Sequence, residues 1–232
     1  MTDFSLVHPA VHSRRVFLRR MASGLLVAGG GAALLGHMDG EAFAQALTQT
    51  PWQTEGPFYP DELPLDSDND LLIINKHITP AVGEVTHLSG RVMDARGEAV
   101  KGAVVEIWQV DHKGVYLNSH DDNGPRDTNF QGYGRFETGK SGAYRFRTIK
   151  PVAYPGRTPH IHLKVWQGER HLLTTQLYVR GDALNERDGV LQSIRNRRQR
   201  ESVIVPFAPI RGSKIGELTA RFDMVLGWTP AA

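Results

Sequence analysis

The chain has 232 residues, with 27 Lys and Arg against 25 Asp and Glu, and no cysteine. This length fits one domain of moderate size with appendages, and the near balance of charge gives no reason to expect a nucleic-acid or anionic-membrane partner. The lack of cysteine excludes disulfides, thiolate metal sites and a cysteine nucleophile, so any metal must be held by nitrogen and oxygen atoms.

Residues 1–44 are predicted to be a signal peptide. Arg14 and Arg15, followed by Val-Phe-Leu, resemble the twin-arginine export signal of bacteria. A Gly- and Ala-rich apolar stretch follows that is too short to predict a membrane span, and residues 42–44 (Ala-Phe-Ala) form a small-x-small cleavage site. We therefore expect a mature chain that begins near Gln45 and is exported to the periplasm or the cell exterior. An uncleaved amphipathic anchor is the alternative.

The mature chain is predicted to consist of an irregular arm and a β-rich domain. Residues 45–87 are rich in proline, and residues 54–60 have turn chemistry around aromatic rings. Residues 88–232 contain short segments of β-branched and aromatic residues separated by turns, which predicts an antiparallel β-sandwich. The predicted strands cover residues 88–94, 103–110, 142–149, 160–166, 171–179 and 218–226.

Two segments interrupt this pattern of strands. Residues 120–134 form a long polar loop, and loops of this length in a compact domain are usually functional or disordered. Residues 185–200 are the one helical candidate, with a thin apolar stripe of Leu184, Leu191 and Ile194. The helix would end on a run of arginines. We interpret that run as a solvated helix terminus near the negative pole of the helix dipole, rather than as a polyanion site.

The most informative stretch is His160-Ile161-His162. Side chains two residues apart on a strand share a face, so the two imidazoles are expected side by side, with the intervening apolar residues facing away, as in a half-buried strand. Such a pair can bind a metal, although ordinary histidines also occur at this spacing. Tyr154 precedes the pair by a Pro-Gly turn that can fold its phenol back over the imidazoles, and Arg157 lies in that turn.

Tyr116 and Tyr154, with His160 and His162, form a candidate donor set of two phenols and two imidazoles. These ligands suit a hard, Lewis-acidic ion such as ferric iron better than zinc, because zinc more often takes histidine with carboxylate or cysteine. A free tyrosine has a pKa of about 10, but a bound cation of high charge can hold it deprotonated.

Stretches spread through most of the mature chain match one protein family. They are residues 56–59, 90–92, 102–109, 114–116, 142–151, 154–155, 160–162 and 175–178. With them, the chain resembles the intradiol ring-cleavage dioxygenases, the family of protocatechuate 3,4-dioxygenase and catechol 1,2-dioxygenase. From this resemblance, together with the strand pattern and the N-terminal segment, we therefore expect an all-β fold: an antiparallel β-sandwich with long active-site loops and one short helix, preceded by a cleavable export signal.

The resemblance also implies a cofactor, non-haem Fe(III), and its ligands. In the family, the tyrosine after the Glu-x-Trp-Gln strand, the tyrosine of the Tyr-Pro turn and both histidines bind the iron. Those positions fall on Tyr116, Tyr154, His160 and His162. Tyr154 is expected to leave the metal and take up a proton when the substrate binds, while Tyr116 stays.

The activity implied is cleavage of a catechol by O2 between its two hydroxylated carbons, which gives a cis,cis-muconate-type diacid. Arg157 stands where the family has the arginine that we expect to stabilise the negative charge developing on the ring. Gln176 stands where the family has a glutamine, and we expect it to orient Arg157 by a hydrogen bond. The expected partners are therefore a small catechol and O2, with no nucleic acid. The sequence leaves open whether the chain forms a homo-oligomer.

The chain departs from the family pattern between Tyr154 and His160. Family enzymes usually carry a longer loop there, often with a tryptophan directly after Tyr-Pro, where this chain has Gly156. The ligand set is unaffected, but the short loop predicts an open pocket that accepts bulky rings. The helical dimerisation region of catechol 1,2-dioxygenases is also missing, so the resemblance is closer to a compact, single-domain, exported member. Which catechol is used stays open.

Two other functions remain as alternatives. Residues 90–116 also resemble transthyretin-like or peptidase-associated β-sandwich modules, which would be non-catalytic binding modules. A sandwich that binds zinc or copper is the second alternative. The joint presence of Tyr154, Arg157, His160 and His162 favours the enzyme, because a binding module needs none of them and a fold alone does not specify function.

Overall fold

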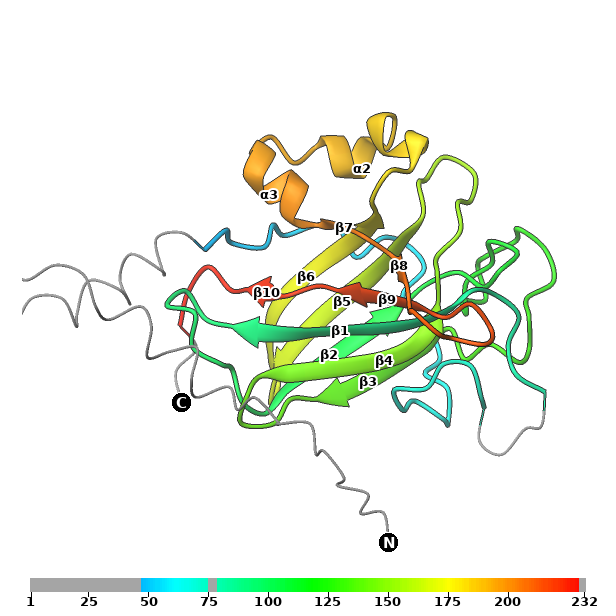
Figure 1. Ribbon diagram of the computed structural model, residues 1–232, viewed down its shortest axis with the longest axis horizontal. Coiled ribbons are helices and arrows are strands. Elements are labelled where there is room, and N and C mark those ends of the chain that lie inside the picture. The colour runs from blue at the N-terminus through cyan, green and yellow to red at the C-terminus, as the bar shows by residue number, and fades with distance from the viewer. Residues whose placement is uncertain (1–46, 75–78, 230–232) are drawn as a thin grey trace, which may run out of the picture. The chain divides into compact units, whose positions relative to one another are not determined.

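The computed structural model describes residues 47–74 and 79–229, so the predicted export signal lies outside the described part of the chain. The described residues form two five-stranded sheets that pack face to face, with little helix (Figure 1). The prediction of a β-rich, sandwich-like fold is therefore confirmed. The first strand begins at Val85, slightly before the predicted start of the β-rich domain at residue 88.

The first sheet is built around the strand β1 (Val85–Met93). On one side, β1 pairs antiparallel with β4 (Ala143–Ile149). On the other side it pairs in parallel with β9 (Leu218–Arg221) and β10 (Met224–Val225), and β8 (Ala208–Pro209) pairs with the outer edge of β9.

The second sheet carries the His-x-His segment near its centre. Its order is β3 (Tyr133–Glu137), β2 (Ala103–Trp108), β5 (His160–Gln167), β6 (Arg170–Val179) and β7 (Ile204–Val205). The β5–β6 hairpin forms as the sequence predicts, whereas β3 begins inside the last two residues of the predicted loop 120–134.

The prediction of purely antiparallel sheets is wrong at three pairings. β1 pairs in parallel with β9 and β10, and β6 pairs in parallel with β7. The predicted strand over residues 218–226 is also divided. Between β9 and β10, the carboxylate of Asp223 accepts the backbone N–H of Arg91 (2.9 Å), so a side chain takes the place of a ladder carbonyl.

The single helix predicted over residues 185–200 is also wrong. The segment contains three short pieces: the 3-10 turn η2 (Ala183–Glu186), α2 (Gly189–Gln192) and α3 (Arg197–Ser202). Asp188 and Asn196 divide it, because each accepts a backbone N–H as the N-cap of the following helix. Leu184, placed in the predicted apolar stripe, is 42% exposed.

The core lies between the two sheets. Alternate apolar side chains of β1, β2, β4 and β5 point into it, among them Leu88, Ile107, Phe146, Ile161 and Leu163, and none of these is more than 2% exposed. The opposite face of β5 is expected from the sequence to be half-buried, but His160 and His162 are almost fully buried as well. Something other than the first sheet must therefore cover that face.

The N-terminal arm covers the outer face of the second sheet. The backbone N–H of Gln53 bonds to the carbonyl of Thr174 (2.9 Å), and the hydroxyl of Thr175 donates to the carbonyl of Pro51 (2.8 Å). Farther along, Phe58 and Tyr59 pack against a small cluster that includes Trp108 and Tyr116. The arm therefore closes the surface on which the two histidines lie.

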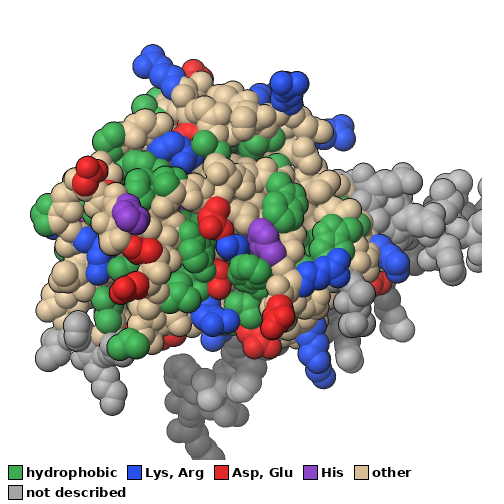
Figure 2. Space-filling model, turned by 180° about the vertical axis from the view of Figure 1, so that it is seen from behind, with side chains coloured by type: hydrophobic (Ala, Val, Ile, Leu, Met, Phe, Trp, Pro, Cys, Tyr) green, Lys and Arg blue, Asp and Glu red, His purple; other side chains and the backbone are tan. Residues whose placement is uncertain are grey.

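Within residues 47–74 and 79–229, no helix is both long and apolar enough to cross a bilayer. On the face seen from behind, acidic and basic side chains are interspersed with apolar ones (Figure 2).

Gly90 allows β1 to approach the break between β9 and β10. A Cβ at this position would lie 1.7 Å from the carbonyl oxygen of Phe222. We expect Gly90→Ala to lower the free energy of unfolding by about 1–3 kcal/mol, because the strands must move apart. Urea denaturation measures this. The control is Gly139→Ala, whose Cβ would meet nothing within 4 Å; equal denaturation midpoints for the two variants would contradict the expectation.

Candidate metal centre and active site

Three side chains meet at one point on the covered face of the second sheet. The hydroxyl oxygen of Tyr116 lies 3.1 Å from Nε2 of His160 and 3.0 Å from Nε2 of His162, and the two Nε2 atoms are 3.1 Å apart. His160 and His162 come from the start of β5, and Tyr116 follows β2 after a turn at residues 111–114. One potential metal-donor atom from each of these three side chains thus forms a corner of a triangle.

Each ring of this triangle is held from behind. Nδ1 of His160 bonds to the carbonyl oxygen of Thr158 (2.6 Å), which fixes the proton on Nδ1 because a carbonyl can only accept. The His162 ring stacks on Trp108, with centroids 4.7 Å apart and planes 12° apart. The Tyr116 ring stacks on Phe58, which comes from the arm (5.1 Å).

Burial keeps these groups uncharged in the metal-free protein. It lowers the pKa of His160 to about 4, with a further contribution from the Arg157 charge, and it lowers the pKa of His162 well below its ordinary value. Burial, together with the nearby Tyr154, raises the pKa of Tyr116 well above its ordinary value. At neutral pH both imidazoles therefore offer lone pairs.

The triangle fits a bound cation better than it fits hydrogen bonds alone. It has three close contacts, but at most two protons to place in them: one from Tyr116 and, in one tautomer, one from Nε2 of His162. A cation bound by all three lone pairs would remove this shortage. Among the described residues no three His, Asp or Glu side chains gather to hold a metal, so the tyrosines are essential to the donor set.

Tyr154 lies beside the triangle on a tight turn. The backbone N–H of Arg157 bonds to the carbonyl of Tyr154 (2.9 Å), which closes the turn that the Pro-Gly pair predicts. The Tyr154 ring centroid is 5.5 Å from that of Tyr116 and 5.6 Å from that of His160. Unlike the other three rings, Tyr154 is only partly buried. The structure thus brings all four predicted metal ligands together.

Arg157 and Gln176, the two other predicted site residues, also meet here. A terminal nitrogen of Arg157 (Nη2) donates to the side-chain oxygen of Gln176 (2.6 Å), and its Nε donates to the carboxylate of Asp188 (2.8 Å). Burial lowers the pKa of Arg157, but the bond to Asp188 outweighs burial and raises it overall. Arg157 is therefore a fixed positive charge next to Tyr154.

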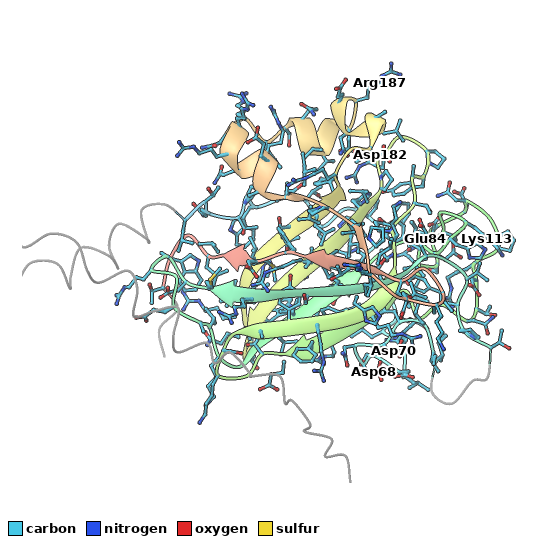
Figure 3. All side chains as sticks on the ribbon, in the orientation of Figure 1. Asp68, Asp70, Glu84, Lys113, Asp182 and Arg187 are labelled. Atoms are coloured by element: carbon cyan, nitrogen blue, oxygen red, sulfur yellow. The ribbon has the colours of Figure 1, made fainter. Side chains whose placement is uncertain are left out.

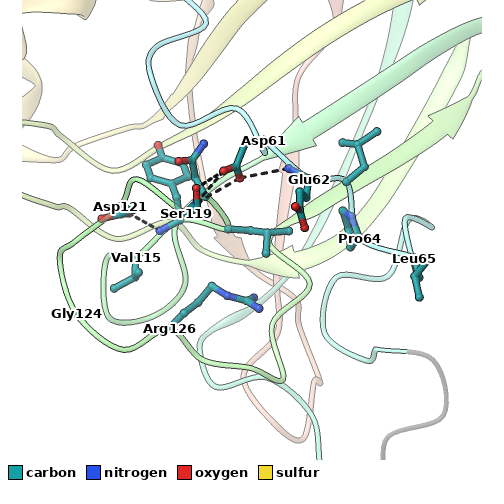
Figure 4. A pocket seen from close by; sticks show the side chains of 13 residues that line it. Asp61, Glu62, Pro64, Leu65, Val115, Ser119, Asp121, Gly124 and Arg126 are labelled. Atoms are coloured by element: carbon teal, nitrogen blue, oxygen red, sulfur yellow. Dashed lines mark hydrogen bonds between the residues drawn. The ribbon is translucent and has the colours of Figure 1, made fainter.

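Two pockets border this region, and only one of them is lined by both Tyr154 and Arg157. The larger, about 600 Å³, is lined by residues 61–65 and 115–119 with Asp121, Gly124 and Arg126 (Figure 4). The phenol of Tyr116 is buried and points away to the histidines. The smaller, about 190 Å³, is lined by Tyr154, Gly156, Arg157, Thr158, Leu184, Arg187 and Asp188. We take this smaller one, called here the Tyr154 pocket, as the candidate substrate pocket.

Sequence reasoning did not find all the residues of this site. Asp188 pairs with Arg157, and the hydroxyl of Tyr178 lies 2.6 Å from the side-chain oxygen of Gln53 and 3.0 Å from that of Gln176. Asp188 does carry a local signal, as an N-cap before an apolar residue. That signal predicts a helix start and says nothing about a partner 31 positions earlier.

Comparison with known protein families gives an assignment that is consistent with the arrangement of these side chains. A protein-family model described as Dioxygenase matches residues 54–227, which is most of the chain. The chain belongs to the intradiol ring-cleavage dioxygenase family. Members of this family typically use non-haem Fe(III).

Several relatives in the intradiol dioxygenase family show how far the likeness extends. The chain is 37% identical over 156 residues to the protocatechuate 3,4-dioxygenase beta chain of Burkholderia cepacia, covering 62% of this chain and 65% of that one. It is 29% identical over 211 residues to the hydroxyquinol 1,2-dioxygenase of Nocardioides simplex, covering 82% and 67%. The chain thus spans about two thirds of the length of these relatives.

A solved structure matches the fold over its full length. It is the dioxygenase domain of a dioxygenase–carbohydrate-binding protein fusion from Streptomyces sp. SirexAA-E. The sequence identity is 28% and the TM-score is 0.59, with 78% of this chain and 100% of that chain covered. The sandwich described above is therefore the fold of an intradiol dioxygenase domain.

Proposed function

We propose that this protein is a non-haem Fe(III) dioxygenase that cleaves a catechol-type ring between its two hydroxylated carbons. Both atoms of O2 enter the product, a cis,cis-muconate-type diacid. The observation that carries the proposal is the triangle of Tyr116, His160 and His162, with atoms 3.0–3.1 Å apart and too few protons for three hydrogen bonds. Tyr154 completes a donor set of two phenols and two imidazoles.

The donor set specifies the kind of metal. Phenolate oxygens and imidazole nitrogens without a thiolate suit a hard ion of high charge. When bound, ferric iron would supply Lewis acidity and a template that orients both catechol oxygens.

The two tyrosines are suited to different roles. Tyr116 is 2% exposed, stacks on Phe58 and has its backbone N–H bonded to Asp121 (2.6 Å), so it cannot move without disturbing the arm. Tyr154 sits on a turn, is partly exposed and faces the Tyr154 pocket. We assign Tyr116 as the permanent ligand. Tyr154 is the ligand that gives way to the substrate and accepts one of its protons.

Arg157 acts on the substrate rather than on the metal, and Gln176 supports Arg157. The Arg157 guanidinium lies beside Tyr154 and borders the pocket, where it stabilises negative charge that develops on the ring during cleavage. Gln176 accepts a hydrogen bond from Arg157 and, through its side-chain nitrogen, donates to the carbonyl of Thr54 (2.9 Å). Through Thr54, the N-terminal arm therefore helps to hold Gln176, which in turn holds Arg157.

The Tyr154 pocket has room for a substituted ring. Its volume, about 190 Å³, exceeds the ~150 Å³ of a cavity known to bind benzene. At Gly156 a Cβ would meet nothing within 4 Å, so the short turn leaves this side of the pocket empty. We propose catechols with a bulky substituent as substrates.

Leu184 on η2 forms the outer wall of the pocket and provides a test of this substrate preference. We expect Leu184→Trp to lower kcat/KM for a bulky catechol about 10-fold or more relative to catechol itself, since lost fit in an apolar pocket is worth that much. The control is Ala183→Trp, which adds the same ring to a neighbouring exposed position outside the pocket lining. A strict preference of the unaltered protein for unsubstituted catechol would contradict the proposal.

A visible absorption spectrum of the purified mature protein tests the function directly. With ferric iron bound, we expect a red-brown tyrosinate-to-iron band that shifts when catechol is added without oxygen. A protein that stays colourless after loading with ferric iron would leave the alternatives: a zinc- or copper-binding sandwich, separated by metal analysis, or a non-catalytic module that binds no metal.

We also propose that the chain is exported by the twin-arginine route. Residues 13–19 and the Ala-Phe-Ala site at residues 42–44 support this proposal. Fractionation of cells that express the full chain, with N-terminal sequencing of the product, tests it. Mature protein that begins near Gln45 outside the cytoplasm is the expected result.

A further inference from the structure

Asp188 is a buried carboxylate that contacts the proposed site. The sequence alone does not predict a role for it. Its side chain is completely shielded from solvent. One oxygen (Oδ2) accepts Nε of Arg157 (2.8 Å) and the backbone N–H of Thr158 (3.0 Å), and the other (Oδ1) accepts the backbone N–H of Leu191 (2.9 Å). A carboxylate with three donors and no water contact is suited to stay ionised. Burial alone raises the pKa of Asp188, but these bonds outweigh it and lower the pKa overall.

Arg157 needs such a support because of its place in the chain. It is the last residue of the turn that begins at Tyr154, and its long side chain has many rotamers when unrestrained. In the structure its guanidinium is held at two nitrogens, by Asp188 at Nε and by Gln176 at a terminal nitrogen. Two bonds to a planar group fix both its position and the orientation of its plane.

The two supports come from different parts of the fold. Gln176 lies on β6, and Asp188 is the residue that begins α2, where its cap to Leu191 fixes the carboxylate relative to the helix. Asp188 and Gln176 occupy Nε and one terminal nitrogen of Arg157, the Tyr178 hydroxyl also interacts with the guanidinium, and Arg157 borders the Tyr154 pocket. Because a guanidinium carries five N–H donors, these supports leave N–H groups that can donate to a molecule in the pocket.

We propose that Asp188 is a positioning residue: it holds the Arg157 guanidinium in the orientation from which its remaining N–H groups act on a ring bound in the Tyr154 pocket. This inference rests on the proposed function for what Arg157 does. The part of the inference that concerns how Arg157 is held depends on the structure alone.

Asp182 supplies a matched control. It is also the N-cap of a short helical piece, accepting the backbone N–H of Leu184 (2.9 Å), and it lies on the same segment, where Figure 3 labels it. Within the described residues its side chain forms no hydrogen bond or ion pair with Arg157, and the hydroxyl of Thr158 donates to it at 3.5 Å. Asp182→Asn therefore makes the same chemical change as Asp188→Asn and leaves the guanidinium untouched.

The first measurement needs neither iron nor activity. In metal-free protein with 15N-labelled arginine, the Nε–H signal of Arg157, assigned by its loss in Arg157→Lys, should exchange slowly with solvent. We expect Asp188→Asn to speed this exchange at least 10-fold and Asp182→Asn to leave it within 2-fold. Unchanged exchange in Asp188→Asn would overturn the proposal.

The second measurement is ring cleavage by the iron-loaded variants. We expect kcat to fall about 10- to 100-fold in Asp188→Asn, which is the usual effect of losing a hydrogen bond that orients a functional side chain. The anaerobic dissociation constant for catechol should change less than 3-fold. Asp188→Ser retains an N-cap and cannot reach Arg157, so it should show the same loss with the fold intact. Normal kcat in Asp188→Ser would count against the positioning role.

The two proposals fail in different ways. If the unaltered protein cleaves no catechol but the Arg157 exchange still depends on Asp188, the ring-cleaving function falls and the support of Arg157 by Asp188 stands. If the protein cleaves catechols and both Asp188 variants behave like Asp182→Asn, the function stands and the positioning role falls.

Discussion

Replacing His162 with alanine is expected to abolish iron binding and, with it, ring cleavage. Nε2 of His162 is one corner of the triangle with Tyr116 and His160, and no described side chain can take its place, because no other His, Asp or Glu gathers there. We expect activity and iron affinity to fall more than about 100-fold, beyond the loss that outer-shell partners of metal ligands cause. Iron content and the visible band measure this together.

The control for this substitution is a histidine on the neighbouring strand. His171 lies on β6, where its Nε2 is 2.8 Å from the hydroxyl of Thr174, away from the triangle. His171→Ala should keep its iron, its colour and its turnover. His162 also stacks on Trp108, so its replacement could disturb the packing of that ring. His160 does not stack on Trp108, and His160→Ala therefore serves as a second variant that should lose iron as well. Near-normal turnover in either His160→Ala or His162→Ala would refute the metal assignment.

Replacing Tyr154 with phenylalanine is expected to slow ring cleavage strongly while iron stays bound. The variant keeps the ring that packs against Tyr116 and His160 but loses the oxygen that we propose as a metal ligand and as the acceptor of a substrate proton. A positioned proton acceptor is worth about 100- to 10,000-fold in rate, so kcat should fall within that range. Stopped-flow mixing with catechol and O2 measures the step directly.

The matched control is a tyrosine with a purely structural bond. The hydroxyl of Tyr144 donates to the carbonyl of Phe222 in the first sheet, far from the metal ligands in the fold. Tyr144→Phe should lower the free energy of unfolding by about 1 kcal/mol, the net value of a typical hydrogen bond, with normal kcat. If Tyr154→Phe turned over as fast as Tyr144→Phe, Tyr154 would have no part in the chemistry.

The ligand strand is the part of the site that elementary rules predict best. Alternation alone places His160 and His162 on one face of β5 and the apolar residues between them on the other. The Pro-Gly pair likewise predicts the turn that returns Tyr154. By contrast, no local pattern relates Tyr116 to the histidines more than 40 positions later, so its place in the donor set depends mainly on the family resemblance.

The errors of prediction also have physical causes. Hydrophobic alternation is the same for parallel and antiparallel neighbours, so it could not reveal that β9 and β10 run parallel to β1. The burial of the histidine face depends on the arm, whose proline-rich sequence shows no periodicity. The sequence does contain a signal that divides the helix predicted over residues 185–200, because Asp188 and Asn196 are good N-cap residues in its interior.

The parallel pairing of β1 with the last strands has a consequence for biosynthesis. Thr86 pairs with Leu218 and Val92 with Met224, so the central strand of the first sheet finds these partners only near the end of the chain. Contacts of such high sequence separation form slowly, and until they form one edge of β1 offers unpaired backbone groups to other molecules. The sandwich therefore closes only after the ribosome has released almost the whole polypeptide. A translocation route that accepts only folded cargo would have to wait for that event, and a product cut short before residue 218 would reach it with an unpaired edge.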